Sequence, residues 1–524
     1  MRGFRLHFAG GIFLRSLACI LPLVAFPCLG NQAEPSEPLV IRHVALIDMI
    51  SAAPRLDMDV VVEGERITAI RKSRSAPVPL HARLVEARNK FLIPGLWDMH
   101  VHVADAKTFF PLFVANGVTG VRDMGMDLEK LKTWREGVRS GSMVGPHIVL
   151  SGPILDGPHT LLPGLALVVT RPEEARETVY DLKGQNVDFI KVYNFLSRDT
   201  YFAIAEEAKK DHLPFAGHVP ISVSAMEAAD AGQHSIEHLT GVLLNCSTEE
   251  AKLRAEIQKA VEDKRFSPAF VNRLLFSSPP PQLSETFSES KARRLFADFV
   301  RNETWQVPTL VVLRAISYGN DRDFQEKQRE KLAYVLPRIR EDWSRAHFHG
   351  RSAAEDIARE KLFQKELELV GDMSHAGVPI MAGTDTPNPY VFAGFSLHDE
   401  LALLVQAGLT PFEALKSATF NPAKYLGLLK SAGTIEVGKE ADLVLLEDDP
   451  LVDIRNIVKI AAVVIGGKVF ERRDLDSMLD EVKMSVIRDA SANENYQPRK
   501  STHRLGATQN EPEEEKPCRR ALNE

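Results

Sequence analysis

Residues 94–103 read PGLWDMHVHV and end an apolar run with two histidines spaced two residues apart. In a β-strand, the side chains at positions i and i+2 point to the same side. His100 and His102 can therefore bind one metal ion from a single strand. The alternative is a pair of surface histidines on an edge strand, and the rest of the chain has to decide between the two.

The composition is that of a soluble globular protein. The chain has 524 residues, of which 44% are hydrophobic and 26% are charged, and its formal net charge is −7. This length predicts one large domain together with a smaller one. The negative charge gives nucleic-acid binding no electrostatic support, so we expect no nucleic-acid partner.

The N-terminus resembles an export signal. Two arginines precede an apolar stretch, residues 12–29, and small and polar residues follow. We interpret residues 1–30 as a signal peptide and expect a periplasmic or secreted bacterial protein. The alternative is an uncleaved membrane anchor, for which the stretch is short. After cleavage we expect no stable membrane span, and Cys246 and Cys518 are too few for a disulfide scaffold.

The two ends of the chain have similar patterns. Residues 38–92 contain short alternating strand patterns separated by turn residues, and a matching set returns at residues 433–473. We predict that both pieces form one composite β-sandwich domain around the middle of the chain. The polar and charged residues 487–524 are predicted to be a disordered tail.

Residues 93–432 alternate between apolar strands and amphipathic helices, which predicts an α/β fold with a parallel sheet. Eight such strands predict a closed (β/α)8 TIM barrel. The charged stretch 247–300 interrupts the alternation, and we expect a helical insertion that either closes over the site or packs on a neighbouring subunit. A second helical stretch is expected at 321–350. The predicted strands are 97–103, 117–125, 147–155, 187–193, 213–219, 234–239, 307–313 and 378–385.

The ends of these strands carry metal-ligand residue types. In such a barrel, catalytic residues lie at the carboxyl ends of the strands. A single histidine in an apolar strand is more often a packing residue, but a series of strands ending in this way favours a metal site. Imidazoles and carboxylates suit zinc and related divalent ions. The candidate ligands are His100, His102, Lys191, His218, His238 and Asp385.

Two of these candidates have further chemistry. Lys191 lies in an apolar strand, where a lone buried ammonium is costly. It either pairs with a carboxylate such as Asp385, or its amine has reacted with carbon dioxide to give a carbamate that bridges two cations. Asp385, in the segment MAGTDTP, is placed to contact a metal and to accept a proton from a water that the metal acidifies.

The segments PGLWDMHVHV, IKVY, AGHVP, SIEHL and AGTDTP, in this order, resemble the amidohydrolase superfamily. The segments GTIEVGKEADLVLLEDDP and NPAKYLGL resemble its C-terminal sandwich and final barrel helix. The resemblance covers residues 38–473. Within the superfamily, GVTGVRDMG and DFIKVYNFLSRDTY are similar to the imidazolonepropionase-like and prolidase-like group, which includes Xaa-Pro dipeptidases.

This resemblance implies a distorted (β/α)8 barrel with a composite β-sandwich and a binuclear centre of two divalent ions, for which zinc is expected. The first ion would be bound by His100, His102, Lys191 and Asp385. The second would be bound by Lys191, His218 and His238. Lys191 would carry the bridging carbamate, and Asp385 would move a proton from water to the leaving amine.

The implied reaction is cleavage of a peptide or amide bond by a metal-activated hydroxide. The substrates would be dipeptides such as Xaa-Pro or Xaa-Arg/Lys, or N-acyl amino acids. His159 and Tyr193 are candidates to contact this substrate. Arg122 either binds a substrate carboxylate or, as we favour, pairs with an acid of the barrel.

Several alternatives stay open. The same centre would also serve a lactonase or a phosphate-ester hydrolase, because one fold supports many reactions. A non-catalytic binding protein is disfavoured, because none of the six ligand positions is lost. The expected partner is a small molecule or short peptide, and a homo-oligomer is compatible with the sequence.

Overall fold

The structure is a computed structural model that describes residues 37–263, 265, 270–271, 274, 282–344 and 350–494. The predicted signal peptide, residues 1–30, lies outside these residues. So does the part of the predicted tail that follows Glu494. Within the described part, no helix has the length and apolar character needed to cross a membrane.

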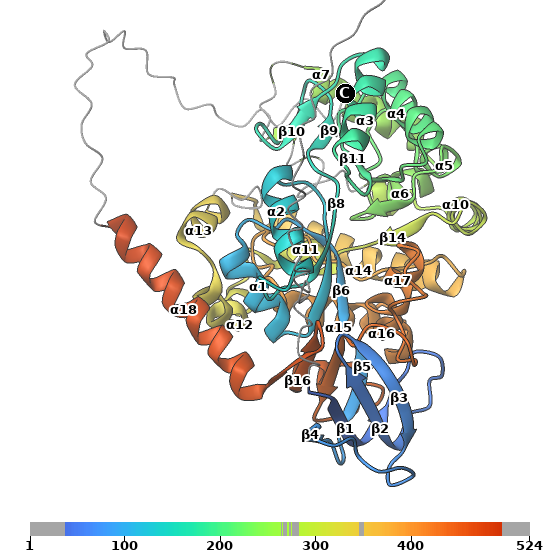
Figure 1. Cartoon of the computed structure of the whole chain (residues 1–524). Helices are drawn as coiled ribbons and strands as arrows, with labels where there is room; N and C mark the ends of the chain where they lie inside the picture. Colours follow the sequence, from blue (N-terminus) through green and yellow to red (C-terminus); the bar gives the residue numbers. More distant parts are fainter. Residues whose placement is uncertain are drawn as a thin grey trace, which may run out of the picture.

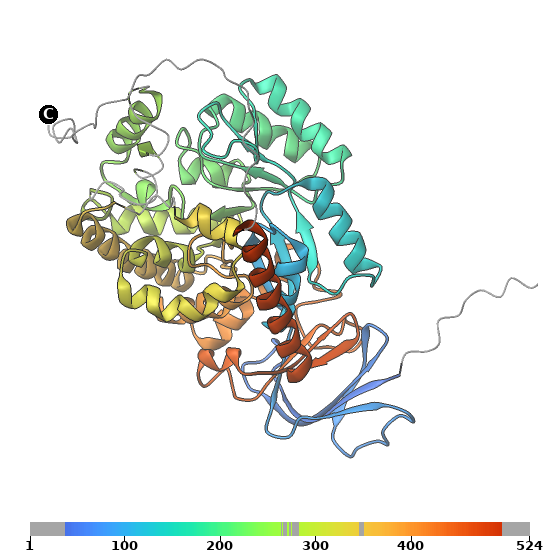
Figure 2. The same cartoon turned by 90° about the vertical axis from the view of Figure 1, so that its left-hand side faces the viewer.

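Both ends of the chain contribute to one eight-stranded sheet, which lies below the helix-covered strands in Figures 1 and 2. Strand β5 (Phe91–Pro94) pairs antiparallel with β15 (Leu443–Leu446) and so joins the two ends. The described strands are connected as a single sheet, and a two-layered sandwich stays a prediction. The other strands are β1 (Leu39–Leu46), β2 (Arg55–Glu63), β3 (Arg66–Lys72), β4 (Arg83–Glu86), β16 (Ile460–Ile465) and β17 (Lys468–Glu471).

The middle of the chain forms two parallel sheets, ordered β6-β7-β8 and β10-β9-β11-β12-β13-β14. This confirms the predicted α/β fold with parallel strands. The first sheet contains β6 (Leu96–Val101), β7 (Val118–Asp123) and β8 (His147–Leu150). The second contains β9 (Ile154–Asp156), β10 (Ala166–Val168), β11 (Ile190–Val192), β12 (Phe215–Gly217), β13 (Ser235–Glu237) and β14 (Trp305–Val307).

Residues 378–385, the predicted eighth strand, and the following Thr386 connect the edges of these two sheets. Isolated parallel bridges join Gln306 to Ile380 and Val101 to Thr386. On the other side of the first sheet, the amide of Asp188 donates to the carbonyl of Leu150 at 2.9 Å. Regular strand pairing is not continuous around the described strands, so a closed barrel stays a prediction.

Two predicted strands differ from the structure. Residues 147–155 form β8 and β9 in separate sheets, because Gly152, with φ of +70°, turns the chain between them. The predicted strand 307–313 ends at Val307, and helix α11 (Leu310–Tyr318) begins after Thr309, which has φ of +48°. A short apolar run does not distinguish a strand from a buried helix by its periodicity.

Helices surround the parallel strands and also cover them on the side away from the eight-stranded sheet (Figure 2). Several begin at a capping side chain, as Asp105 does for α1 and Ser352 for α14, which satisfies free amides of the first turn. The covering helices are α1 (Ala106–Ala115), α2 (Leu128–Arg139), α3 (Pro172–Gly184), α4 (Arg198–Lys210), α5 (Ala225–Asp230), α6 (Val242–Cys246), α11, α14 (Ala353–His375), α15 (Phe395–Gln406), α16 (Pro411–Ser417) and α17 (Phe420–Tyr425).

The two predicted helical insertions are helical where they are described. Residues 247–300 contain α7 (Glu250–Glu262), α9 (Gln282–Glu285) and much of α10 (Glu289–Arg301). Residues 321–350 contain α12 (Arg322–Gln328), η2 (Arg329–Tyr334) and α13 (Pro337–Trp343).

The C-terminal part begins with the short helix η3 (Ile454–Val458), before β16. Helix α18 (Arg472–Glu494) packs against α1 and continues through residues 487–494, which we had predicted as tail. The helix packs against an apolar surface of the rest of the molecule. The polar composition of residues 487–524 does not indicate this packing.

The buried apolar side chains form two main clusters. The larger fills the space between the parallel strands and their helices and includes Phe113, Ile190 and Leu401. The smaller lies within the eight-stranded sheet and includes Val60 and Leu443. The pocket described below lies at the carboxyl ends of the parallel strands, on the side away from the eight-stranded sheet.

Candidate metal centre

The residues predicted as metal ligands all line one pocket of about 490 Å³. They lie at or just after the carboxyl ends of β6, β11, β12 and β13 and in the segment after Ile380. Tyr193, a predicted substrate residue, lines the same pocket. Parallel strands bring their carboxyl ends to one edge, so residues far apart in the sequence meet here. The six ligand candidates in the pocket are His100, His102, Lys191, His218, His238 and Asp385.

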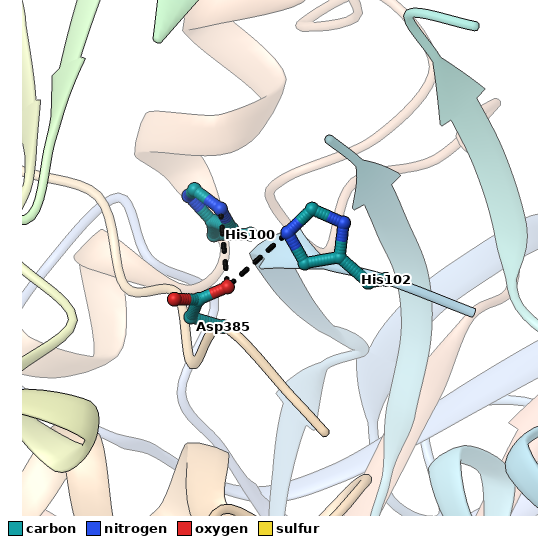
Figure 3. Close-up of side chains that lie close together, drawn as sticks. All are labelled: His100, His102 and Asp385. Carbon is teal, nitrogen blue, oxygen red and sulfur yellow. Dashed lines mark ion pairs between the residues drawn. The ribbon is translucent and has the colours of Figure 1, made fainter. Parts of the chain in front are cut away.

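The carboxylate of Asp385 lies between three imidazoles. Its Oδ1 is 3.2 Å from Nε2 of His102 and 3.4 Å from Nε2 of His100 (Figure 3). Its Oδ2 is 3.7 Å from Nε2 of His238. The three histidines therefore direct the same ring nitrogen toward one carboxylate.

Lys191 and His218 form the other side of the site. The ring of His218 lies 4.8 Å from that of His238 and 4.1 Å from that of Tyr193, measured between centroids. Lys191 is only 1% exposed. Its amine makes no ion pair with any carboxylate of the described residues. The alternative in which Lys191 pairs with Asp385 is therefore not what the structure has.

Two glycines allow the ligand-bearing segments to approach closely. A Cβ on Gly217 would lie 2.2 Å from the carbonyl oxygen of Val192 and 3.0 Å from Cδ of Lys191. A Cβ on Gly383 would lie 2.9 Å from the backbone nitrogen of His100. Glycine at these positions thus sets the distance between Lys191 and β12, and between Asp385 and β6.

The backbone is strained at two of the ligands. His238 has φ of +56° and Asp385 has φ of +64°. This left-handed region is unfavourable for residues other than glycine, although aspartate and histidine tolerate it better than most. Such conformations persist where surrounding contacts hold them, and they concentrate at functional sites.

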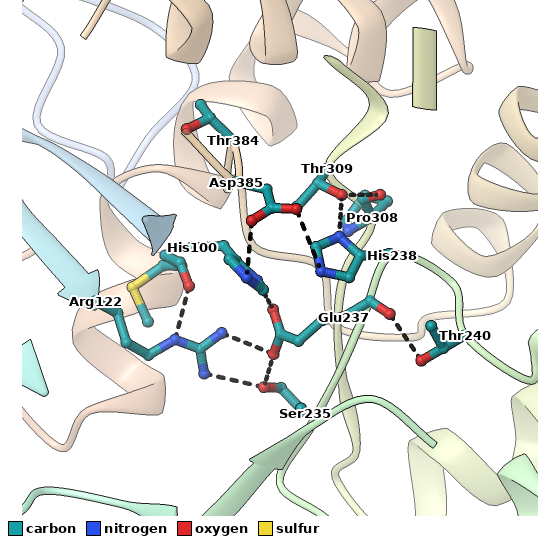
Figure 4. A network of polar contacts seen from close by, with 12 residues as sticks. His100, Arg122, Ser235, Glu237, His238, Thr240, Pro308, Thr309, Thr384 and Asp385 are labelled. Atoms are coloured by element: carbon teal, nitrogen blue, oxygen red, sulfur yellow. Dashed lines mark hydrogen bonds and ion pairs between the residues drawn. The ribbon is translucent and has the colours of Figure 1, made fainter. Parts of the chain in front are cut away.

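A buried network orients His100 (Figure 4). Its Nδ1 lies 2.8 Å from Oε2 of Glu237. The other oxygen of Glu237 accepts a hydrogen bond from Arg122 at 2.9 Å and one from Ser235 at 2.5 Å. Arg122 is fully buried and pairs with this acid of the barrel, which is the role that we favoured for it. Because Nδ1 of His100 is occupied, its Nε2 faces the pocket.

The other histidines are oriented in the same way. Nδ1 of His238 lies 2.6 Å from Oγ1 of Thr309, and Nδ1 of His218 lies 2.8 Å from Oδ1 of Asn194. Nδ1 of His102 lies 3.2 Å from the carbonyl oxygen of Gly125.

Sequence analysis missed the side-chain partners Glu237, Asn194 and Thr309. Two of them adjoin predicted site residues, since Glu237 precedes His238 and Asn194 follows Tyr193. That adjacency is the one signal that could have indicated them.

Burial keeps most of these groups in the form that binds a metal. It lowers the pKa of His238 to about 4 and holds those of His100 and His218 well below the ordinary value. It also lowers the pKa of Lys191 to about 8. Burial is the largest influence on the pKa of His102 and lowers it, but the hydrogen bond with Asp385 and the charges of Asp385 and Asp123 together raise the net pKa above its ordinary value. A neutral imidazole is the form that coordinates a metal.

The donor set fits a divalent cation. The ligand atoms of His100, His102 and Asp385 all lie within 4.8 Å of one another. Nε2 of His100 is buried and has no hydrogen-bond partner in the described part of the chain. An unpaired buried polar atom is costly, and a cation beside Asp385 would satisfy it. Imidazole nitrogen and carboxylate oxygen are ligands of zinc and of the neighbouring divalent ions.

His159 is not brought to this pocket. It is exposed on the loop after β9, where its ring lies 6.5 Å from that of Phe195, and it is not among the lining residues. The same loop instead directs Leu161, Leu162 and Leu165 toward the pocket. A substrate contact by His159 is therefore not supported by the geometry.

His234, on the same strand as His238, is also apart from the site. It stacks on Tyr425 with 4.4 Å between ring centroids. This placement agrees with assigning the ligand role on this strand to His238.

A second group of possible ligands, His147, Glu440 and Asp442, lies at the opposite ends of the strands. Nε2 of His147 is 2.8 Å from Oδ2 of Asp442, and this contact ties β8 to the segment that leads into β15. Burial is the largest influence on the pKa of His147 and lowers it, but the hydrogen bond to Asp442 and the charges of the nearby carboxylates together raise the pKa to about 8. The pair thus links the parallel strands to the eight-stranded sheet.

Comparison with known proteins agrees with this site. The sequence model of the amidohydrolase family matches residues 339–470. Ochratoxinase from Aspergillus niger is 30% identical over 165 residues, which cover 30% of this chain and 33% of that protein. Imidazolonepropionase from Pseudomonas syringae pv. tomato is 46% identical over 84 residues, which cover 16% of this chain and 21% of that protein. The matched region thus spans about a third of the length of the first relative.

Solved structures share the fold over most of the chain. Bottromycin amidohydrolase aligns with a TM-score of 0.65 and 23% identity, covering 85% of this chain and 90% of that one. A Xaa-Pro dipeptidase with bound methionine aligns with a TM-score of 0.59 and 20% identity, covering 83% and 100%. The A. niger ochratoxinase structure aligns with a TM-score of 0.57 and 20% identity, covering 83% and 96%.

Fold and site together define a parallel α/β protein with metal-binding residue types at its strand ends. The match of residues 339–470 to the amidohydrolase family model agrees with the resemblance of the motifs. At the identities found, the structural neighbours establish the shared fold.

Proposed function

We propose that this protein is a metal-dependent hydrolase that cleaves the peptide or amide bond of small substrates. The observation that carries this proposal is the convergence of four imidazoles, a lysine and a carboxylate in one pocket. The amidohydrolase match and the dipeptidase and ochratoxinase among the relatives support the same reaction class. We also propose that the parallel strands act as one closed, distorted barrel and the eight-stranded sheet as its composite sandwich.

We propose two divalent ions, with zinc as the expected metal. His100, His102, Asp385 and a carbamate on Lys191 would hold the first. His218, His238 and the same carbamate would hold the second. Support for the carbamate comes from the buried amine of Lys191, which lacks an ion pair among the described residues and whose pKa is lowered to about 8 by burial. A less protonated amine reacts more readily with carbon dioxide.

The bound ions would supply Lewis-acid activation of water and of the scissile carbonyl. Asp385 would accept the proton of the attacking water. Burial raises the pKa of Asp385, but the neighbouring His238 and His102 together lower it by more. Its net pKa therefore lies below the ordinary value. Asp385 would then return the proton to the leaving nitrogen.

Tyr193 would orient the substrate. It lines the pocket and packs on His218. Burial raises the pKa of its hydroxyl, so the group stays protonated and can donate a hydrogen bond to the substrate carbonyl.

The proposed substrates are dipeptides, such as Xaa-Pro or Xaa-Arg/Lys, and N-acyl amino acids. The dipeptidase among the structural neighbours supports the first class. Export to the periplasm or beyond is proposed as well, from residues 1–30. Cell fractionation of the tagged full-length chain tests that proposal, and protein retained in the cytoplasm would contradict it.

Amine release from a panel of dipeptides and N-acyl amino acids tests the function directly. The protein would be loaded with zinc in bicarbonate, with Asp385→Asn as the catalytic control. We expect turnover by the wild type and a loss of about 100-fold or more in the variant. Removal of metal by a chelator should abolish turnover, and added zinc should restore it.

A negative result is equally informative. If protein carrying two equivalents of metal releases no amine from any member of the panel, the peptide or amide hydrolase is wrong. Lactones and phosphate esters would then be the substrates to test on the same centre.

A further inference from the structure

Beyond the ligand side chains, the pocket has a largely apolar wall. Three leucines of the loop after β9 line it, together with residues of α11 and α13. The described residues of the insertion at 247–300 do not line this pocket. The apolar lining residues include Ile154, Leu161, Leu162, Leu165, Ile316 and Trp343. Such a wall favours apolar groups on both sides of a scissile bond.

One guanidinium interrupts this apolar wall. Arg338, on α13, is the only arginine among the lining residues. Its Nη2 donates to the carbonyl oxygen of Ala104 at 3.5 Å, a long hydrogen bond. It makes no ion pair with any carboxylate in the part of the chain that the structure describes. Asp342, one helical turn further on, also lines the pocket and has an interaction of its own.

Two contacts place helix α13, which carries the exposed Arg338, beside the candidate metal centre. Its own hydrogen bond reaches Ala104, two residues after His102. At the end of the same helix, the indole nitrogen of Trp343 donates to the carbonyl oxygen of Pro387 at 2.7 Å, two residues after Asp385. Helix α13, which is labelled in Figure 1, therefore contacts two of the three segments that carry the first set of candidate ligands, those of His102 and Asp385.

We propose that Arg338 binds a free carboxylate on the substrate and so selects N-acyl amino acids and dipeptides whose leaving residue is apolar and keeps its carboxyl group. This inference rests on the proposed amide hydrolysis and adds the specificity of the same pocket. An arginine fork matches a carboxylate with two parallel hydrogen bonds. The apolar wall receives the side chain of the leaving residue and the acyl group.

A pair of substrates that differ only in the carboxylate tests the inference. N-benzoyl-leucine and its decarboxylated analogue, N-isopentylbenzamide, share the scissile amide and both apolar groups. We expect the wild type to prefer the acid in kcat/KM. Arg338→Gln should lower that preference by about 10- to 100-fold, mainly through KM, because a charge-assisted hydrogen bond is lost. Arg338→Lys should restore part of it.

Arg329→Gln is the matched control. Arg329 lies on the same inserted segment, is exposed, pairs with Glu326 and does not line the pocket. The Arg329→Gln substitution removes the same charge as Arg338→Gln but lies outside the pocket, so the preference for the acid should be unchanged. An Arg338→Gln variant that loses activity equally on both substrates, or that keeps the full preference, would overturn the inference.

Direct binding separates this inference from the proposed reaction. Calorimetric titration of zinc-loaded protein with the two compounds needs no turnover. Tighter binding of the acid that is lost in Arg338→Gln supports the carboxylate site, even if neither compound is hydrolysed. Equal affinities in the wild type would rule out the site, whereas absent hydrolysis alone would count against the proposed function.

Discussion

Nδ1 of His100 and Oε2 of Glu237 lie 2.8 Å apart in a fully buried contact between β6 and β13. The contact directs Nε2 of His100 toward Asp385, and the second oxygen of Glu237 accepts from Arg122. A carboxylate in this position fixes the tautomer of a ligating imidazole and makes it a better donor. Glu237 is therefore a positioning residue for the centre.

Glu237→Gln removes this charge and keeps the shape of the side chain. We expect metal affinity to fall by about 10- to 100-fold. Competition with a chromophoric chelator measures the affinity, and circular dichroism verifies that the variant is folded. The exposed Glu256→Gln is the control and should bind metal as the wild type does. An unchanged affinity in a folded Glu237→Gln variant would show that the contact is not needed to orient His100.

Lys191→Ala removes the amine that the proposed carbamate needs. We expect the bound metal to fall from about two equivalents to about one or fewer, because a bridging ligand is lost. Elemental analysis after dialysis measures this stoichiometry. In the wild type, zinc loading should depend on bicarbonate, and the variant should show no such dependence. Two equivalents of metal in Lys191→Ala would contradict the bridge.

Gly217→Ala tests the close approach of β12 to Lys191. The added Cβ would lie 2.2 Å from the carbonyl oxygen of Val192, so one of the two strands must move. We expect a loss of about 1–3 kcal/mol in the free energy of unfolding, together with weaker metal binding. Gly232→Ala is the control, because Gly232 also has positive φ but its Cβ would meet nothing within 4 Å. Chemical denaturation should show the larger effect at Gly217.

The pair of His147 and Asp442 should make stability depend on pH. The folded pKa of His147 is raised to about 8, above the ordinary value of about 6.5. The folded state thus favours the protonated ring, and the resulting stabilisation is complete below about pH 6.5 and is lost as the pH rises through about 8.

His147→Gln should therefore lower the free energy of unfolding at pH 6 and have a smaller effect at pH 8.5. Denaturation of wild type and variant at both values measures this difference. The exposed His81→Gln serves as the control, since no described partner links it to the eight-stranded sheet. An effect of His147→Gln that is equal at both pH values would exclude a stabilising protonated ring.

Most of the parallel strands and the residues that line the pocket were predictable from local sequence patterns. β11, β12 and β13 lie within predicted strands, and β6 begins one residue before its predicted strand. His100, Lys191, His218 and His238 line one pocket. Local patterns were enough for this, because each strand is a short apolar run that ends in a ligand residue. The split of residues 147–155 and the helix after Thr309 were missed, since a short apolar run fits several conformations.

The sequence by itself determined which side chains can bind a metal and the order in which the strands present them, because residue type and strand periodicity are local properties. Only the tertiary structure decided how those side chains are oriented. The pairing of His238 with Thr309 joins residues 71 positions apart, and that of His100 with Glu237 joins residues 137 positions apart. The tertiary structure also decided that Arg338 lines the pocket and that His159 does not. The positions of these two residues depend on how an inserted helix and a loop pack against distant strands. Contacts of this kind depend on how the whole domain packs, and local sequence patterns do not predict that packing.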